Sequence, residues 1–215
     1  MTGNRVNYAM VTVGGARRDI SDELRKEILS AGDKLKSVLD RIAEIATTDK
    51  TIALRTKGVG VLTREDALRM GAVGPHARAS GVDIDVRRDA PYSSYGDFKF
   101  KVPVVDSGDV YARVLVRVLE CYESIEIIRQ ALEMLPEGPI NLGNKLPKIK
   151  EGQAVCRHEA PRGQLSHMVV GDGGFNNHRV SILVPSYKNT PTVPVMLRNN
   201  TVADAGHIIA SIDPC

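Results

Sequence analysis

Three short clusters in the C-terminal part of the chain hold side chains that could do chemistry. In the first, Pro161 fixes the backbone and Gly163 allows a tight turn, so Arg162 between them is held on a rigid turn at the end of a strand. A guanidinium held in this way offers a fixed fork of donors to an anion. On the pattern alone, an ordinary hairpin with a surface arginine is the favoured alternative.

The other two clusters lie further along the chain. Pro185 and Ser186 follow a strand-like segment, where a hydroxyl and backbone N–H groups can face an anion, although an ordinary turn has the same pattern and is favoured. Asp213, Pro214 and Cys215 are the last three residues, and a thiolate is a soft ligand for nickel, iron or zinc. A lone cysteine is not a metal site, so a structural role for Cys215 is favoured unless a second ligand exists.

Two long amphipathic helices are expected to position these clusters. The first covers residues 22–47, because Ser21 can cap it and apolar residues then recur at helical spacing. The second covers residues 109–135 and is ended by Pro136. Cys121 lies among the apolar residues of this second helix, which predicts a buried thiol.

The stretch between the two long helices has a different pattern. Residues 49–62 look like a loop, and residues 63–70 form a short helix that Thr63 opens and Gly71 ends. Residues 74–95 are rich in glycine, proline and charge, which predicts a long irregular segment. Such long loops in compact domains are usually functional.

The C-terminal part of the chain predicts short strands. Residues 154–159, 165–170 and 179–183 are expected to form a small antiparallel sheet. Thr201 caps a short helix, and residues 207–212 form an apolar, strand-like run. The predicted fold class is therefore α+β and mainly helical, with two long helices and a small antiparallel sheet at one end.

The composition is that of a globular protein. Hydrophobic residues make up 42% and charged residues 26% of the 215 residues, which suffice for one domain. The net charge is only +3, with 29 basic and 26 acidic residues mixed along the chain, so no nucleic-acid patch is expected. No run reaches the roughly 18 apolar residues that a membrane span needs. The 3 cysteines fit a reducing compartment, and the 5 histidines show no metal-ligand spacing.

Taken together and in order, these clusters and several longer segments resemble the large subunit of nickel–iron (NiFe) hydrogenases. The closest likeness is to the energy-converting membrane-bound type, of the Ech and formate hydrogenlyase kind. The likeness covers nearly all of the chain. Its segments are TGNRVNYAMVTVGGARRDI, GPHARASGVDIDVRRDAPY, GDVYARVLVRVLECYESI, EAPRGQLSH, VPSYKN and MLRNNTVADAGHIIASIDPC. The second segment and EAPRG are shared with the related quinone-pocket subunit of respiratory complex I, which lacks the final DPC motif, so the ending favours the hydrogenase branch.

The resemblance implies a nickel–iron centre, Ni-Fe(CN)2(CO), in which four thiolates hold the nickel and two of them bridge to the iron. Cys215 matches a terminal nickel ligand. Arg162 matches an arginine that hangs over the metals, bonds a cyanide and assists H–H cleavage, while Ser186 matches the hydroxyl that bonds the other cyanide. Pro161 matches the apolar neighbour of the diatomic ligands, and Asp213 a carboxylate near the arginine. Because a guanidinium is a poor base, a purely electrostatic role for Arg162 is the alternative.

The resemblance also implies that the chain is one part of a larger subunit. Residues 1–215 are expected to be a partial domain of the large subunit, with the long-helix bundle core of the hydrogenase and complex I type, incomplete at both ends. The family's N-terminal Cys-x-x-Cys segment and the residues after Cys215 are absent from this sequence. With one thiolate of four, the isolated piece is expected to be inactive and to expose a large apolar patch.

The implied function is catalytic. The complete subunit would couple H2 oxidation or proton reduction to an iron–sulfur relay, with a 4Fe–4S cluster in a small partner subunit. Further partners would be other complex subunits, a membrane arm and the missing part of its own subunit, but no nucleic acid. The complex would lie on the cytoplasmic face of the membrane, with this chain peripheral. The alternative is a non-catalytic, complex I-like subunit that forms a quinone pocket or scaffold without nickel.

Overall fold

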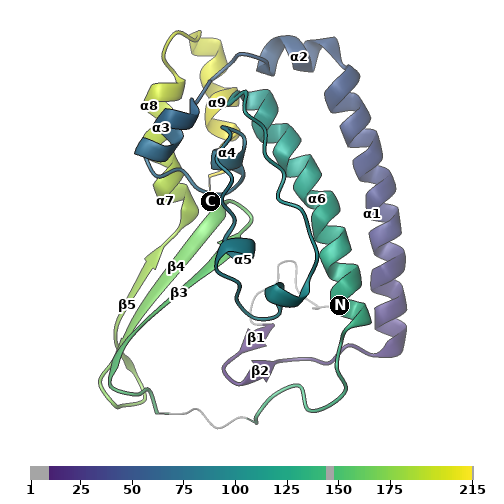
Figure 1. The fold of residues 1–215 in the computed structure, drawn as a ribbon, viewed down its shortest axis with the longest axis vertical. Coiled ribbons are helices and arrows are strands. Elements are labelled where there is room, and N and C mark those ends of the chain that lie inside the picture. The colour runs from purple at the N-terminus through teal and green to yellow at the C-terminus, as the bar shows by residue number, and fades with distance from the viewer. Residues whose placement is uncertain (1–9, 144–147, 215) are drawn as a thin grey trace.

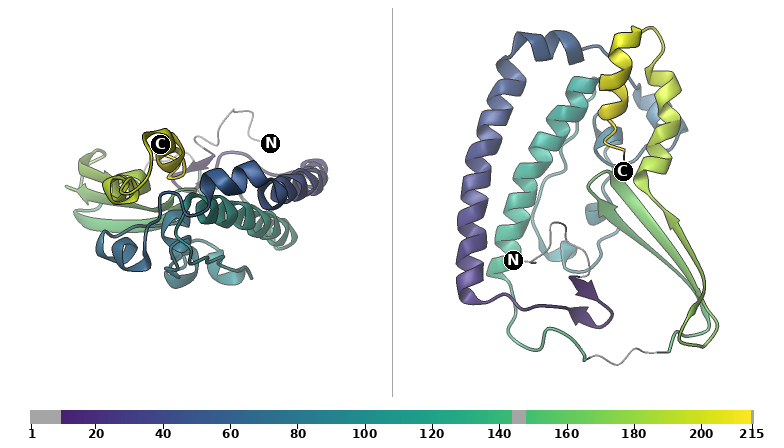
Figure 2. Two further views of the ribbon diagram at one scale, coloured as in Figure 1. Left: turned by 90° about the horizontal axis from the view of Figure 1, so that it is seen from above. Right: turned by 180° about the vertical axis from the view of Figure 1, so that it is seen from behind.

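The computed structural model describes residues 10–143 and 148–214. Two long helices stand side by side, and a three-stranded sheet extends as an arm on the other side of the molecule (Figures 1 and 2). The short helices of the C-terminal part gather above the end of this arm that joins the body (Figure 1). In the described ranges, no helix has both the length and the apolar character to cross a membrane.

The long helices are α1 (Asp22–Thr48) and α6 (Val110–Glu133). Both confirm the helices predicted from apolar spacing. Ser21 and Asp109 cap their first turns, because each side chain accepts a hydrogen bond from the backbone N–H three residues on. These caps satisfy N–H groups that have no partner within the helix.

Polar contacts between the two long helices show their relative direction. The hydroxyl of Tyr122 donates a hydrogen bond to Asp40 at 2.8 Å, and Arg129 forms an ion pair with Asp33. The later residue of α6 meets the earlier residue of α1, so the helices run antiparallel. A larger helix bundle stays a prediction.

A short helix, α2 (Lys50–Thr56), occupies part of the stretch that was predicted to be a loop. Asp49 interrupts the helical path with extended backbone (φ −73°, ψ 116°), and its carboxylate then accepts hydrogen bonds from the N–H groups of Thr51 and Ile52. One aspartate therefore ends α1 and begins α2. The next helix, α3 (Arg64–Arg69), is the short helix expected after Thr63.

The glycine- and proline-rich middle segment is partly helical and its first part is buried. It contains α4 (Pro75–Arg78), α5 (Val86–Asp89) and a 3-10 turn, η1 (Tyr95–Asp97). Every residue from 74 to 80 is buried, and α4 packs against α6. The first part of this segment therefore belongs to the protein interior, which its polar composition did not indicate.

The sheet confirms the three predicted strands. It consists of β3 (Gly152–Ala160), β4 (Gly163–Gly171) and β5 (Asn177–Leu183), all antiparallel and in the order β3-β4-β5. Its free end points away from the helices, and its β3–β4 turn enters the body of the protein (Figure 1). A separate small hairpin joins β1 (Val11–Thr12) and β2 (Gly15–Ala16).

The C-terminal part is a chain of short helices. They are α7 (Pro185–Asn189), η2 (Thr190–Thr192), α8 (Val193–Met196), η3 (Val202–Asp204) and α9 (Ala205–Ala210). The prediction of a strand-like run at 207–212 is wrong. Thr201 and Asp204 form a capping box that starts the helical stretch, as expected for Thr201. Ile208 of α9 and Ile212 of the turn after it are buried in the main core.

Candidate functional site

Arg162 lies on the two-residue turn that joins β3 to β4. The register pairs Ala160 with Gly163, which leaves Pro161 and Arg162 as the turn. Gly163 (φ 125°) packs directly against Gly74, where an added Cβ would stand 2.3 Å from Gly163 Cα. Only residues without a Cβ allow two backbones to approach so closely, and this contact holds the turn in place.

A buried amide from the second cluster supports the same turn. Asn189 in α7 donates from Nδ2 to the carbonyl of Val73 (3.2 Å) and to the carbonyl of Arg162 (3.4 Å). Its Oδ1 accepts a hydrogen bond from the Val73 N–H at 2.9 Å. The clusters around Arg162 and Ser186 are therefore connected through one side chain, which is fully buried.

The first and third clusters meet through Arg162 and Asp213. Arg162 Nε donates to the backbone carbonyl of Asp213 at 2.9 Å and lies 3.0 Å from Oδ2, while Nη2 donates to Oδ1 at 3.2 Å. Asp213 has a positive φ of 58°, so the turn after α9 is tight. The guanidinium is 29% exposed and the carboxylate 48% exposed, so this pair is open to a further ligand or partner.

The remaining predicted site residues lie around this pair. Ser186 is buried in α7, the helix that also carries Asn189, and its carbonyl accepts a hydrogen bond from Thr190 at 2.7 Å. Pro161 lines a pocket beside the pair. Cys215 lies outside the described residues, so its predicted ligand role stays a prediction.

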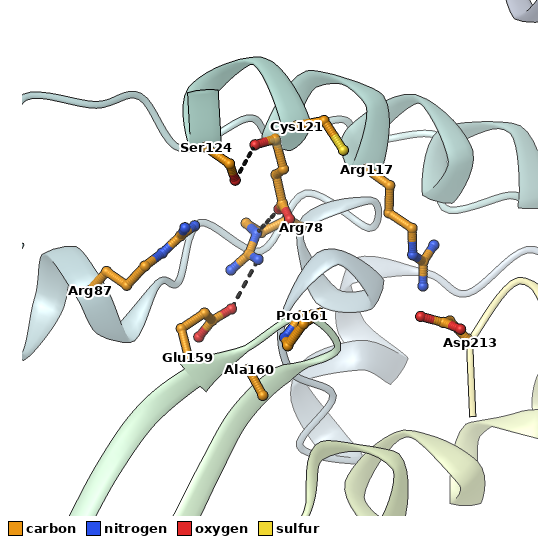
Figure 3. Close-up of a pocket in the computed structure, with 10 residues that line it drawn as sticks. Arg78, Arg87, Arg117, Cys121, Ser124, Glu159, Ala160, Pro161 and Asp213 are labelled. Carbon is orange, nitrogen blue, oxygen red and sulfur yellow. Dashed lines mark hydrogen bonds and ion pairs between the residues drawn. The ribbon is translucent and has the colours of Figure 1, made fainter. Parts of the chain in front are cut away.

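The pocket has a volume of about 320 Å³ and lies between α6, the middle segment and the β3–β4 turn (Figure 3). Asp213 and Pro161 form one side. The other side carries ionisable residues to which the sequence analysis assigned no role, although they lie in segments that carry the family resemblance. The lining residues are Arg78, Arg87, Arg117, Glu120, Cys121, Ser124, Glu159, Ala160, Pro161 and Asp213.

Arg117 reaches across the pocket toward Asp213 (Figure 3). Its Nη1 donates to the carbonyl of Arg113 at 2.9 Å, whereas its buried Nε has no hydrogen-bond partner among the described residues. Burial lowers the pKa of Arg117, and the charge of Asp213 offsets part of this effect. Asp213 therefore lies between two guanidinium groups, those of Arg162 and Arg117.

A buried charge cluster forms the far side of the pocket. Arg78 is only 1% exposed and donates to Glu120 at 2.7 Å and to Glu159 at 2.9 Å. It also lies 3.5 Å from Asp85, but Asp85 has a closer partner in Arg87, whose Nε and Nη2 donate to its two carboxylate oxygens at 3.0 and 2.6 Å. A bidentate arginine–carboxylate pair of this kind is a strong interaction.

The pKa values of the two most buried carboxyl groups of this cluster are shifted in opposite directions. Burial alone would raise the pKa of Asp85, but the hydrogen bond from Arg87 and the charge of Arg78 hold it below its usual value. Burial raises the pKa of Glu159, and Arg78 offsets only part of that rise. Glu159 is therefore the carboxyl group of the pocket that accepts a proton more readily than an ordinary glutamate.

The prediction that Cys121 is buried is wrong, because its side chain is exposed and lines the pocket. Apolar neighbours in the sequence of a helix do not show whether another element covers the side chain. Among the described residues, no group of three or more His, Cys, Asp or Glu side chains is arranged to hold a metal ion. The donor residues fit an anionic ligand beside Arg162, but the described residues do not form a metal site by themselves.

Two comparisons with sequences place the chain among respiratory proteins. The family described as "Respiratory-chain NADH dehydrogenase, 49 Kd subunit" matches residues 1–151 and 143–215. The chain is 38% identical to the carbon monoxide-induced hydrogenase of Rhodospirillum rubrum, covering 99% of this chain and 59% of the relative. It is also 38% identical to a subunit of the NADH-quinone oxidoreductase of Clostridium beijerinckii, covering 99% of this chain and 58% of the relative. The matched relatives therefore include both hydrogenases and quinone reductases.

A solved structure supports the same relationship. The chain matches a chain of the membrane-bound sulfane sulfur reductase, an archaeal respiratory membrane complex, with a TM-score of 0.88 and 35% identity over 94% of this chain and 57% of that chain. The alpha subunit of the membrane-bound hydrogenase of Pyrococcus furiosus is 38% identical, and 54% of its length is covered. The chain thus spans less than two thirds of the relatives that it matches. Because the two family matches together cover the whole chain, it belongs to the family of the 49-kDa subunit of respiratory-chain NADH dehydrogenase.

Proposed function

We propose that this chain is part of the hydrogen-activating subunit of a NiFe hydrogenase in a membrane-associated complex. The single observation that carries the proposal is the pairing of Arg162 with Asp213, two residues before Cys215 in the sequence. The guanidinium and the carboxylate are thereby in contact, and a thiol follows the carboxylate by two positions in the sequence. The hydrogenases among the relatives support the same assignment.

In this proposal Arg162 and Ser186 supply donors to the anionic ligands of the iron, and Pro161 shields them from water. Anionic ligands in a dry site need fixed donors, because an unpaired charge is costly to bury. Asp213 forms an ion pair with Arg162, and its negative charge favours the charged form of the guanidinium. An electrostatic role for Arg162 therefore fits better than a role as a proton acceptor. The chain offers one thiolate of the four that nickel requires. Residues outside this chain must therefore supply the other three.

The test measures nickel in the assembled complex that contains this chain. Cys215→Ala should remove bound nickel and hydrogen-dependent dye reduction, because a thiolate ligand is lost. Cys156→Ala is the matched control, since Cys156 is an exposed thiol on β3. Nickel that is retained in Cys215→Ala, or lost equally in Cys156→Ala, would rule out the ligand role of Cys215.

A second candidate is a quinone-pocket or scaffold subunit without nickel. The observation that favours it is the identity to an NADH-quinone oxidoreductase subunit. In that case the complex would hold no nickel, and Cys215→Ala would leave its electron transfer unchanged. The same measurement therefore separates the two candidates.

A further inference from the structure

The charge cluster beside the pocket contains more carboxylates than guanidinium groups. Asp85, Glu120 and Glu159 face Arg78 and Arg87, which makes three potential negative charges against two positive ones. Arg87 is committed to Asp85 through two short contacts. Arg78 is therefore shared by Glu120 and Glu159. The charge of Arg117 also acts on Glu120, whereas Arg78 is the one arginine that forms an ion pair with Glu159 among the described residues.

Burial decides which of the two is the better proton acceptor. The side chain of Glu159 is 6% exposed, whereas that of Glu120 is 15% exposed. An uncompensated charge costs most where water is least accessible, so the extra proton is held best by Glu159. The direction of its pKa shift, upward because of burial, agrees with this reasoning.

The position of Glu159 relative to the pocket gives this proton a route. Glu159 is three residues before Arg162 on the same hairpin, and both Glu159 and Asp213 line the pocket of about 320 Å³. Each water molecule occupies about 30 Å³ of liquid volume, so a pocket of this size can hold several. Water in the pocket can therefore connect the Arg162–Asp213 end with the carboxylate of Glu159.

We propose that Glu159 is the proton-loading group of this pocket and that Glu120 is its exit toward solvent. A proton released at the Arg162–Asp213 end binds the Glu159 carboxylate and converts it to the neutral acid. The acid then passes this proton to the Glu120 carboxylate, which releases it to water, and the reverse order supplies protons when they are consumed. The proposal rests on the proposed function for its direction, because either H2 oxidation or proton reduction needs such a group.

The charged and titratable groups around Glu159 come from several elements. Arg78 belongs to α4, Arg87 to α5 with Asp85 at its N-cap, and Glu120 to α6. From the loop after α5, the Tyr92 hydroxyl accepts a hydrogen bond from the Glu159 N–H at 3.1 Å. Because Arg78 also holds Glu159 in place, a structural role must be separated from proton transfer by the choice of variants.

The central variant is Glu159→Gln in the assembled complex. Glutamine keeps the oxygen that accepts from Arg78 Nη2 but cannot take up a proton at the pH of the assay. Glu126→Gln is the matched control, because Glu126 is an exposed glutamate of α6 that also contacts an arginine, Arg129. Glu159→Asp restores a titrating group at the same position and serves as the rescue variant.

Two measurements are made on these proteins. Infrared difference spectra between pH steps should show a carboxylic acid band that titrates above the ordinary glutamate pKa of 4.5, is absent in Glu159→Gln and remains in Glu126→Gln. Hydrogen-dependent turnover should fall on the order of 10- to 100-fold in Glu159→Gln with an unchanged KM, and Glu159→Asp should recover part of it with a shifted pH profile.

Distinct outcomes overturn the two proposals. If the band is absent from the unmodified complex, or if Glu159→Gln and Glu126→Gln share the same turnover and pH profile, Glu159 is not a proton-loading group. If the band is present and specific to Glu159 but the complex shows no hydrogen turnover, the assignment of the proton site stands and the proposed hydrogenase function is wrong. Circular dichroism and the assembly state verify that each variant is folded.

Discussion

At the scale of single residues, His76 shows how burial decides a protonation state. Its Nε2 lies 2.9 Å from Thr192 Oγ1, and that hydroxyl donates its own proton to the carbonyl of Asn189 at 2.6 Å. Nε2 must therefore carry the hydrogen, which leaves Nδ1 as a buried acceptor without a partner among the described residues. A second proton on Nδ1 would find no acceptor, and burial lowers the pKa of His76 to about 3, with help from Arg113 and Arg117.

This depressed pKa predicts a loss of stability in mild acid. The unfolded chain binds a proton at an ordinary histidine pKa of 6.5, whereas the folded chain does not bind it until about 3, so stability falls as the pH drops through this window. Between pH 7 and pH 5 the His76 contribution to the free energy of unfolding should fall by about 2 kcal/mol. Urea unfolding of His76→Gln should lack this part of the pH dependence, while His178→Gln, at an exposed site, should retain it. Equal pH dependence in both variants would contradict the neutral assignment.

At the scale of elements, the position of the β3–β4 turn depends on two glycines. Gly74 has a φ of 68°, and a Cβ there would stand 2.3 Å from Gly163 Cα and 2.5 Å from the carbonyl oxygen of Arg162. Gly74→Ala should therefore push the turn away and cost roughly 2–4 kcal/mol, from backbone strain and overpacking together.

The control for this prediction is Gly71→Ala. Gly71 has nearly the same φ, 67°, but an added Cβ would meet no atom within 4 Å, so only the backbone strain remains. Thermal unfolding measures the loss of stability in each variant, and the difference between the two losses is the steric contribution at Gly74. Faster hydrogen exchange at the hairpin turn should appear in Gly74→Ala alone, and equal effects in the two variants would show that the close approach does not hold the turn.

Local patterns predicted the two long helices, α3 and the three strands of the larger sheet, and the failures have physical reasons. Apolar spacing and capping residues located α1 and α6, and the Pro-Arg-Gly pattern located the hairpin turn. The short helices α2, α4, α5, α7 and α8 were missed, and part of α9 was assigned to a strand, because a few residues without long periodicity do not distinguish helix from loop or strand. The charge cluster was missed because its members are distant in sequence: Arg78 is 42 residues from Glu120 and 81 from Glu159. Only the fold brings such side chains together.

At the scale of the whole molecule, one side of the α1–α6 pair exposes apolar side chains. Leu35, Val38 and Ile42 of α1 are 50%, 54% and 45% exposed, and Ile128 of α6 is 46% exposed. Between the two helices lies an apolar groove of about 170 Å³ that Leu35 and Ile128 help to line. Exposed apolar areas of this kind mark interaction surfaces or lead to aggregation, so the chain is expected to need a partner at this face.

This face predicts the behaviour of the chain when it is produced alone. It should bind a hydrophobic fluorescent dye and self-associate in a concentration-dependent way, because association removes apolar surface from water. The double substitution Val38→Ser and Ile42→Ser should reduce both effects without loss of helix content, since both positions are solvent-exposed. The control replaces Lys34 and Arg41 by serine. Both are exposed polar residues of the same helix, so dye binding should stay unchanged. Dye binding and sedimentation that do not differ between these two variants would show that this side of α1 is not the surface that requires cover. If the first variant alone becomes monodisperse, the apolar face of the long helices is the part of the chain that a partner protects in the complete assembly.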